Sequence, residues 1–372
     1  MPKTAAKGGE DVRGIVYRAP GEVSVETVPD PGIVEPGDAI VRVTKAGVCG
    51  SDLHIYNHGD AFGFDPGCRL GHELVGVVEE VGPDVAGLRP GQKVASPFWI
   101  SCGQCHYCQR GLQTSCVSGG AYGFQPFWPG GGEVQGGQSQ YVRVPMADGT
   151  LVPVPEGIAG DEHDARVLPL TDVFTTAYHA VVGADIAEGN TVLVVGDGAV
   201  GLLACHAARL RNPAAIVLAG HHDDRLEAGR ALGATHMVNT REGDGLGDVL
   251  GGLTDGRGPE AVIDAVSSAD SMKRAVEAVQ PGGTVSWVGM EVFLGPIDLP
   301  WDICFLRNLT IRGGVAPVRR YLPEMFALLE RGDIDPSPVL THDLTMEEGA
   351  SGYAMMAERR PGVVKVAVTP GA

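Results

Sequence analysis

Positive charge is scarce in this chain. Of its 372 residues, 28 are Lys or Arg and 46 are Asp or Glu, so the formal net charge is −18. A surface of this sign repels the phosphate backbones of nucleic acids and anionic lipid headgroups. Nucleic acids and membrane surfaces are therefore not expected as partners, whereas a small phosphate ligand in a local positive pocket is compatible with the charge.

Long apolar runs are also missing. No stretch approaches the roughly 18 apolar residues of a membrane-spanning helix, and residues 1–11 lack the apolar core of a secretory signal peptide. The expected location is therefore the cytoplasm. Closely spaced cysteines in that compartment indicate a metal site rather than disulfides.

What the chain does contain is typical of a globular enzyme with two domains. Hydrophobic residues make up 44% and charged residues 20%, which provides apolar side chains for two cores at this length. The 55 glycines and 26 prolines fall at many separate turns, which favours a loop-rich enzyme over a linker.

Short strands joined by Gly/Pro turns characterise the first half of the chain. Ala39–Thr44 alternates apolar and polar residues, and Leu74–Val81 and Tyr141–Val144 are further short runs of this kind. These segments predict an irregular, mostly β domain.

The pattern changes near Thr171, where apolar strands begin to alternate with helical stretches. The expected strands are Thr191–Val195, Ile216–Ala219, His236–Val238, Ala261–Asp264, Thr284–Val288 and Leu309–Arg312. The helices expected between the first five strands are Val200–Leu210, Arg225–Leu232, Leu246–Thr254 and Met272–Val279. A Gly/Pro-broken loop is expected between the last two strands. This alternation predicts an α/β fold with a parallel, doubly wound, six-stranded sheet.

The last part of the chain returns to the character of the first. After Gly314 come two helical stretches, Val318–Arg331 and Met346–Glu358, and a final strand, Val363–Val368. We expect this strand to join the first domain. The parallel sheet would then be inserted between two pieces of the mostly β domain.

A glycine-rich turn follows the first strand of the parallel sheet. Gly196-Asp-Gly198-Ala-Val-Gly201 has the spacing G-x-G-x-x-G and leads into an expected helix. Gly196 would form the tight turn, Gly198 would let a pyrophosphate approach the backbone, and Gly201 would let the helix pack on the strand. The triplet alone also fits an ordinary turn, but its place at the first of six alternating units predicts dinucleotide binding.

The loop after the second strand lacks the Asp or Glu that usually binds both ribose hydroxyls of NAD. Gly220, His221 and His222 stand there instead, and Arg225 follows one helical turn later. The missing carboxylate and the two imidazoles leave room for a 2′-phosphate, to which Arg225 could add a fixed cation. NADP is therefore favoured. The alternative is that the histidines are exposed loop residues and that NAD binds.

Four cysteines in one short loop form the strongest single signal. They are spaced C-x2-C-x2-C-x7-C, at Cys102, Cys105, Cys108 and Cys116. Four thiolates can close a tetrahedron around Zn²⁺ and leave no position for substrate, so the loop predicts a structural zinc. Free or disulfide-bonded cysteines are the alternative, and His106 inside the loop is expected at the surface.

A second set of metal-ligating residue types lies outside this loop. Cys49 follows a strand, His72 precedes another, and Asp172 stands near the change of pattern. One Cys, one His and one carboxylate supply three protein ligands and leave the fourth position to water or substrate, as in a catalytic zinc site. Taken singly, Cys49 and His72 could equally be core residues.

These motifs occur in the order found in a known family. The chain resembles the zinc-dependent medium-chain alcohol dehydrogenases over almost its full length. The residues that carry the resemblance are Cys49-Gly-Ser-Asp-x-His54, Gly71-His-Glu73-x-x-Gly76 with Val81-Gly82, Pro90-Gly91-x-x-Val94, the four-cysteine loop, Asp172-x-x-x-Thr176 and Gly196-x-Gly-x-x-Gly201.

The resemblance implies two domains with the active site in the cleft between them. Residues 1–173 and 316–372 would form a GroES-like, mostly β catalytic domain that carries a zinc lobe at about 102–116. Residues 174–315 would form an inserted Rossmann domain. The resemblance also implies a small-molecule substrate and a homodimer or homotetramer.

The resemblance further implies a catalytic zinc on Cys49, His72 and Asp172, with Glu73 as an adjacent carboxylate that joins it transiently. Zinc brings the pKa of a bound hydroxyl into the physiological range. The implied reaction is hydride transfer between an alcohol, or in reverse an aldehyde or ketone, and a nicotinamide cofactor. Asp52 is expected either to orient His72 or to act as a plain helix N-cap.

The implied proton route runs from Ser51 through the cofactor ribose to His54, whose pKa near neutrality suits proton transfer. The alternative is that Ser51 and His54 cap a helix. Thr176 is expected to contact the nicotinamide carboxamide. The full set of expected cofactor-binding residues is Thr176, Gly196, Gly198, Ala199, Val200, Gly201, Gly220, His221, His222, Arg225, Val266 and Val288.

Asp172 departs from the pattern of many family members, which have Cys or Glu there. Asp is closer to members that act on secondary alcohols with NADP, although these often lack the cysteine lobe. A polyol or formaldehyde dehydrogenase and a catalytically silent cofactor-binding protein are therefore alternatives to an alcohol dehydrogenase. Two zinc ions per chain are expected of an enzyme, whereas a silent protein could carry one.

Two groups of side chains carry weaker expectations. Phe98, Trp99 and Trp128 either line an apolar substrate pocket or belong to the core. The cysteines outside the motifs, Cys68, Cys205 and Cys304, are expected to be small core residues.

Overall fold

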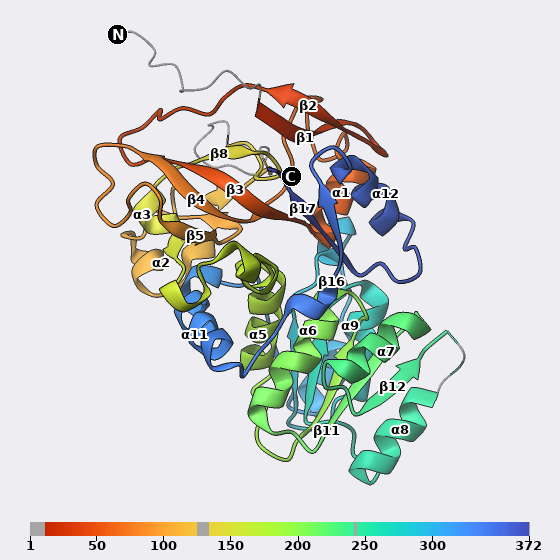
Figure 1. Ribbon diagram of the computed structural model, residues 1–372. Coiled ribbons are helices and arrows are strands. Elements are labelled where there is room, and N and C mark those ends of the chain that lie inside the picture. The colour runs from red at the N-terminus through yellow and green to blue at the C-terminus, as the bar shows by residue number, and fades with distance from the viewer. Residues whose placement is uncertain (1–11, 125–133, 242, 244, 372) are drawn as a thin grey trace. The chain divides into compact units, whose positions relative to one another are not determined.

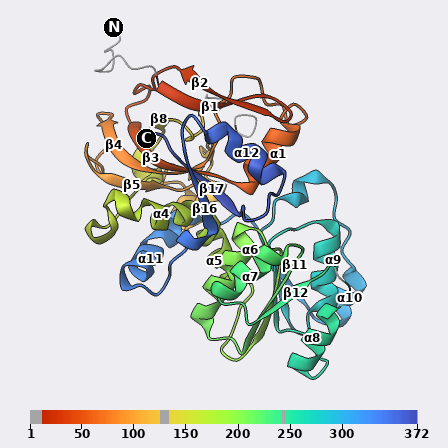
Figure 2. The same cartoon turned by 45° about the vertical axis from the view of Figure 1, so that its right-hand side comes forward.

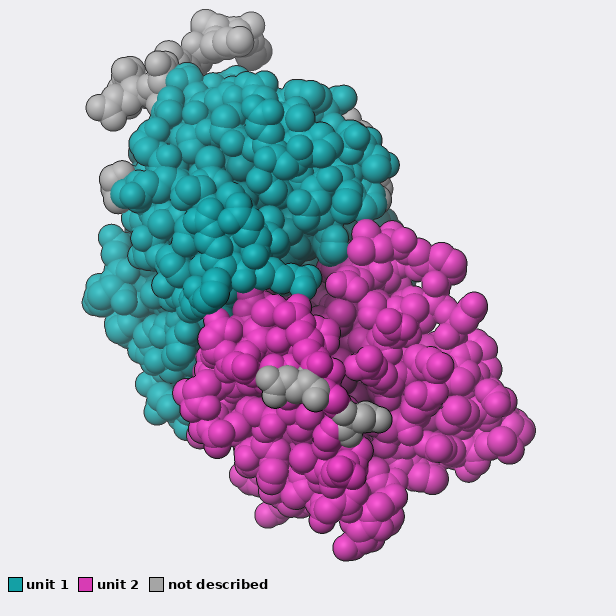
Figure 3. All heavy atoms as spheres, turned by 90° about the vertical axis from the view of Figure 1, so that its right-hand side faces the viewer, with its two compact units in different colours: residues 1–172, 317–372 teal, residues 173–316 magenta. Residues whose placement is uncertain are grey.

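The computed structural model describes residues 12–124, 134–241, 243 and 245–371. The chain divides into two compact units: unit 1 is residues 1–172 with 317–372, and unit 2 is residues 173–316 (Figure 3). Each of the two domain boundaries expected from the sequence lies one residue away from the corresponding boundary between the units. The polar segment 1–11 and Trp128 lie outside the described residues. No helix in the described part of the chain is long and apolar enough to cross a membrane.

Unit 1 is built on a seven-stranded sheet that is antiparallel except between its first two strands (Figure 1). In spatial order its strands are β16 (Leu340–Thr345), β17 (Lys365–Thr369), β3 (Ala39–Val48), β4 (Glu73–Val81), β5 (Lys93–Ser96) and β9 (Val152–Pro153). β8 (Tyr141–Val144) pairs with the first residues of β3, and β17 with its last. The three strands expected in the first half are therefore present, and the last strand of the chain joins this sheet as expected.

Shorter elements surround the sheet of unit 1. Two pairs of strands stand apart from it, β1 (Val12–Ala19) with β2 (Glu22–Val28) and β6 (Trp99–Ile100) with β7 (Gly120–Ala121). The helices are α1 (Gly50–His58), α2 (His106–Gln109), α3 (Ala147–Thr150), α4 (Asp164–Val167), α11 (Val318–Arg331) and α12 (Gly349–Ala357). α12 begins three residues later than the helical stretch expected at Met346–Glu358, because Met346–Glu348 form a turn.

Unit 2 contains a six-stranded sheet in which every described neighbouring pair is parallel. In spatial order its strands are β12 (His236–Asn239), β11 (Ala215–Gly220), β10 (Thr191–Val195), β13 (Ala261–Asp264), β14 (Thr284–Trp287) and β15 (Thr310–Gly313). By order along the chain this is 3-2-1-4-5-6, the arrangement of a Rossmann sheet. The central strands are buried along their length, as strands covered on both faces must be.

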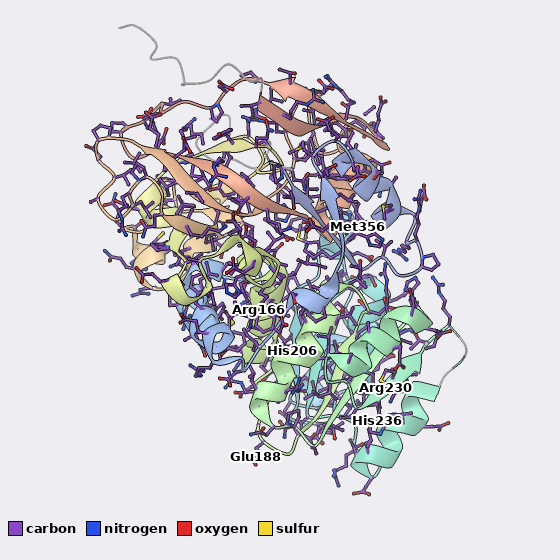
Figure 4. All side chains as sticks on the ribbon, viewed as in Figure 1. Arg166, Glu188, His206, Arg230, His236 and Met356 are labelled. Carbon is purple, nitrogen blue, oxygen red and sulfur yellow. The ribbon has the colours of Figure 1, made fainter. Side chains whose placement is uncertain are left out.

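Helices cover both faces of this sheet (Figure 2). The helices of unit 2 are α5 (Val173–Gly183), α6 (Ala199–Ala208), α7 (Asp223–Ala231), α8 (Gly245–Thr254), α9 (Ala269–Ala278) and α10 (Trp301–Leu306). α5 packs on α6, where Phe174 meets His206 edge-on at 5.9 Å between ring centres (Figure 4). The sequence reading missed α5 and the short α10, which lies in the segment expected to be only a broken loop.

Candidate active site

The register of β3 and β4 brings the first set of candidate ligands together. Gly47 near the end of β3 pairs with Glu73 at the start of β4. Cys49, two residues beyond Gly47, therefore lies beside His72, the residue before β4. Asp172 joins them from the end of a short 3₁₀ turn at Leu168–Thr171.

The side chains of these residues converge. Sγ of Cys49 lies 3.4 Å from Oδ2 of Asp172, and Nε2 of His72 lies 3.3 Å from the same oxygen. One ligand atom from each of Cys49, His72, Glu73 and Asp172 lies within 4.8 Å of the others, and all four residues are buried. Ser51 is adjacent, with its Oγ 3.2 Å from Nε2 of His72.

The donor set fits zinc, which binds sulfur, imidazole nitrogen and carboxylate oxygen. Burial raises the pKa of the Cys49 thiol to about 11, and the charges of Asp172 and Glu73 add to the shift. A dication would offset these negative charges and allow the thiolate to form. Oε2 of Glu73 is buried and has no hydrogen-bond partner among the described residues, which leaves it available to a cation.

A buried lysine holds the other oxygen of Glu73. Nζ of Lys365 lies 2.6 Å from Oε1 of Glu73 and donates to the carbonyl of Val48 at 3.2 Å. Burial lowers the pKa of Lys365, but the attraction of Glu73 outweighs it and the pKa lies above its usual value. Lys365 begins β17, which pairs with β3 beside Cys49. Sequence reading missed it because only this pairing brings residue 365 to the site.

Asp52 faces His72 and is not the N-cap of α1, which is Cys49, although it supports that cap from the third position of the helix. Its Oδ2 accepts the backbone N–H of Cys49 at 2.9 Å, which caps the first turn of α1. Its Oδ1 lies 3.1 Å from Nδ1 of His72, although the angle there is poor for a hydrogen bond. Nδ1 therefore faces Asp52, and Nε2 is left toward Cys49 and Asp172.

Two further buried side chains hold Asp52 in place. Nε2 of Gln138 donates to Oδ2 of Asp52 at 3.1 Å and to the carbonyl of Gly47 at 2.8 Å. Tyr353 of α12 donates to Oε1 of Gln138 at 2.6 Å. Outer partners of this kind fix the orientation of a ligating imidazole. No sequence motif marks Gln138 or Tyr353, because they reach the site only through the tertiary fold.

Aromatic rings border the cluster on one side. Phe98 is buried and lies edge-on to the His72 ring, at 6.2 Å between ring centres. Phe124, which the sequence reading missed, lies closer, at 5.5 Å. Trp99 belongs instead to the cysteine lobe, where its indole nitrogen lies over Gly119.

The four lobe cysteines form a second, separate cluster. Their sulfurs lie within 4.8 Å of one another, and no sulfur is in a disulfide. Backbone N–H groups point at two of them: that of Cys105 at Sγ of Cys102, 3.3 Å away, and that of Cys102 at Sγ of Cys116, 3.2 Å away. His106 is exposed and outside the cluster, as expected.

The thiols of this lobe respond differently to their surroundings. Backbone N–H groups of Cys108 and Val117 lower the pKa of Cys105 to about 6. Burial raises the pKa of Cys108 to about 12, and the neighbouring thiols Cys105 and Cys116 add to the shift. A cation is needed to hold all four as thiolates, and four sulfur ligands leave no open position on zinc.

The glycine turn of unit 2 has the geometry that dinucleotide binding requires. Gly196 has φ +110°, a left-handed conformation that favours glycine. A Cβ on Gly201 would lie 1.8 Å from the carbonyl oxygen of Gly196, so only glycine fits there. Space above Gly198 is open, and Ala199 and Val200 begin α6, whose N–H groups can receive a pyrophosphate.

Comparisons with known proteins agree with this geometry. The family model for the alcohol dehydrogenase GroES-like domain matches residues 35–156, and that for zinc-binding dehydrogenases matches residues 199–331. A probable zinc-binding alcohol dehydrogenase of Mycobacterium tuberculosis is 36% identical over 96% of this chain and 89% of its own. The chain belongs to the zinc-dependent medium-chain alcohol dehydrogenases.

Two other proteins extend this likeness. An NADP-dependent isopropanol dehydrogenase of Thermoanaerobacter brockii is 35% identical over 84% of this chain and 86% of its own. The solved structure of an alcohol dehydrogenase from Thermus sp. ATN1 has a TM-score of 0.87 and 34% identity, covering 96% of this chain and 99% of its own. This member of the family is thus an NAD(P)-dependent, zinc-containing enzyme that moves hydride between an alcohol, aldehyde or ketone and a nicotinamide cofactor.

The remaining expected site residues of this alcohol dehydrogenase lie as follows. His54 is half-buried on α1, one turn after Ser51, and Thr176 is half-buried in the first turns of α5. Val266 follows β13, where its side chain lies against Gly196, and Val288 follows β14. The cysteines outside the motifs, Cys68, Cys205 and Cys304, are buried in the cores of the two units, as expected.

Proposed function

We propose that this chain holds two zinc ions and moves hydride between a small alcohol and NADP. One zinc would be held by Cys49, His72 and Asp172, and the other by the four-cysteine lobe. The observation that carries the proposal is the buried convergence of sulfur, imidazole and carboxylate donors within 4.8 Å, apart from a closed set of four thiols. Zinc at the first cluster supplies a Lewis acid that lowers the pKa of a substrate hydroxyl.

In this proposal Glu73 and Lys365 control the charge beside the first zinc. Lys365 neutralises Glu73 through the ion pair at 2.6 Å, which holds Oε1. Oε2 has no hydrogen-bond partner among the described residues and would be available to the metal. Phe98 and Phe124 reduce the access of water to His72 from their side.

Ser51 and His54 are proposed to carry the substrate proton away. Ser51 places its hydroxyl beside the cluster, 3.2 Å from Nε2 of His72. His54 lies three residues later on the same helix, and this spacing puts both side chains on one side of α1. Neither residue caps the helix, because Cys49 is the N-cap residue and Asp52 accepts its N–H.

His54→Gln should slow alcohol oxidation most near neutral pH, because glutamine cannot accept the proton. The loss should be about a hundredfold or less and should shrink at alkaline pH, where hydroxide replaces the base. A pH–rate profile of kcat measures this. The matched control is His58→Gln, which makes the same change on an exposed residue at the end of α1. A profile unchanged by His54→Gln would contradict the proton route.

NADP is proposed as the favoured cofactor, with NAD as the alternative. Support comes from the name of the Thermoanaerobacter relative and from the absence of an acidic side chain at Gly220 itself. Absorbance at 340 nm with a panel of primary and secondary alcohols tests this. We expect a higher kcat/KM with NADP than with NAD on the best substrate. The reverse order would overturn the preference and leave the family activity intact.

Assembly and location are proposed on separate grounds. Large apolar side chains of unit 2 are exposed on and near α10, which leads into the edge strand β15: Phe293, Leu294, Trp301, Phe305 and Leu306. Exposed apolar groups beside an open strand edge favour a homo-oligomer, a dimer or tetramer, which light scattering can measure. Four closely spaced free cysteines favour a reducing compartment, the cytoplasm.

A further inference from the structure

Asp197, the residue between the first two glycines of the turn, has an unusual set of hydrogen-bond partners. Asp197 is 7% exposed, and its Oδ2 accepts the backbone N–H groups of His221 at 2.6 Å and His222 at 2.8 Å. The same oxygen lies 3.0 Å from Nδ1 of His222. Burial alone would raise the pKa of Asp197, but the hydrogen bonds from His221 and His222 lower it by more. The pKa therefore lies below its usual value, and the carboxylate is ionised at neutral pH.

Asp197 occupies the space of a side chain at position 220. A Cβ built on Gly220 would lie 2.6 Å from both Cβ and Oδ2 of Asp197. In Rossmann folds the acid that binds the ribose hydroxyls follows the second strand, which here is β11, ending at Gly220. The chain therefore does have a carboxylate at this place, but the turn after β10 supplies it.

Two arginines from other elements lie near His221. Partial burial lowers the pKa of His221, and repulsion by Arg241, His222 and Arg274 lowers it further, against the attraction of Asp197. His221 is thus a neutral N–H donor at neutral pH. Fixed positive charge comes from Arg241, just after β12, and Arg274 of α9. Sequence reading missed both arginines because only the tertiary fold brings them near His221.

We propose that Asp197 determines how strongly this enzyme discriminates between NADP and NAD. Its carboxylate takes the same N–H groups of residues 221 and 222 that a 2′-phosphate would use, and its charge repels that phosphate. Arg241 and Arg274 act in the opposite sense. The balance of these groups, rather than the lack of an acid at Gly220, sets the preference. This inference rests on the proposed use of a nicotinamide dinucleotide.

Binding of two adenosine fragments tests the proposal without turnover. Adenosine 2′,5′-bisphosphate carries the 2′-phosphate, and ADP carries free ribose hydroxyls. Calorimetry should show that Asp197→Asn binds the bisphosphate about tenfold or more tightly than wild type, because one repelling charge is gone. The affinity for ADP should change about threefold or less. The control is Asp185→Asn, which removes the same charge from an exposed residue. Asp185 precedes the amino end of β10, whereas Asp197 follows its carboxyl end, so this change should alter neither affinity.

A carboxylate swap separates charge at this place from damage to the turn. Asp197→Gly should bind the bisphosphate as tightly as Asp197→Asn, and Asp197→Gly combined with Gly220→Asp should return its affinity to the wild-type value. Two results for Asp197→Asn would overturn the role of Asp197 and leave the cofactor proposal intact. They are an equal gain in affinity for both fragments and no gain in affinity for the bisphosphate. Wild-type protein that binds neither the fragments nor either dinucleotide would overturn the cofactor proposal, and this one with it.

Discussion

Cys49→Ala should abolish turnover and leave the protein folded. The thiol supplies the one sulfur donor of a cluster in which the other candidate ligands are His72, Asp172 and Glu73. Loss of a Lewis acid that contributes several kcal/mol to the transition state corresponds to a fall in kcat of about a thousandfold or more. The fold should persist because the cluster sits at the ends of strands whose pairing does not depend on it.

Three measurements together check this result: kcat at 340 nm, zinc per chain by atomic absorption, and the thermal unfolding midpoint. We expect about one zinc instead of two. Cys68→Ala is the matched control, because it makes the same change at a buried cysteine of unit 1 that packs in the core and lies outside both candidate metal clusters. Cys49→Ala protein with near-normal activity would show that the catalytic zinc is placed wrongly.

Much of unit 2 was predictable because its signals are local. Apolar runs alternate with helical stretches over the whole unit, and the glycine spacing marks the first turn, so the strands and the Rossmann sheet are confirmed. α5 was missed because seven of its eleven residues, Val173–Gly183, are apolar, and its three polar side chains are too few to mark a wide polar face. The Asp197 contact could not be read either, since a carboxylate in a glycine turn has no partner until β11 lies beside β10.

The residues of the candidate site in unit 1 also fall into two groups, those that belong to local motifs and those that only the tertiary fold brings to the site. Cys49, Ser51, Asp52, His72 and Glu73 belong to two short motifs, and the spacing of metal-ligating residue types within them can be read directly. Lys365, Gln138, Tyr353 and Phe124 come from other elements and carry no motif. They touch the cluster or its supports only because β17, α12 and the loops near them fold against β3 and β4. Such residues become visible only when strand pairing is known.

Cys105→Ala should produce the opposite signature to Cys49→Ala, a loss of stability with the chemistry retained. The lobe has little core of its own: α2 spans four residues, and β6 and β7 span two each. Zinc therefore supplies much of the free energy that holds this loop. Cys105 is the informative position because it is partly exposed, unlike the buried Cys108 and Cys116. Its removal costs a ligand and little packing.

The expected result for Cys105→Ala is a fall in the thermal midpoint of roughly 5 °C or more, with the zinc of the lobe lost and its loop open to proteases. Below the new midpoint, kcat per folded chain should stay within about threefold of wild type, because a closed four-sulfur site has no position for substrate. Cys205→Ala, at a buried cysteine of unit 2, controls for the loss of a thiol. An unchanged midpoint with two zinc ions still bound would mean that the lobe is not a zinc site. Loss of turnover in a fully folded Cys105→Ala protein would instead make this cluster catalytic and reverse the two assignments.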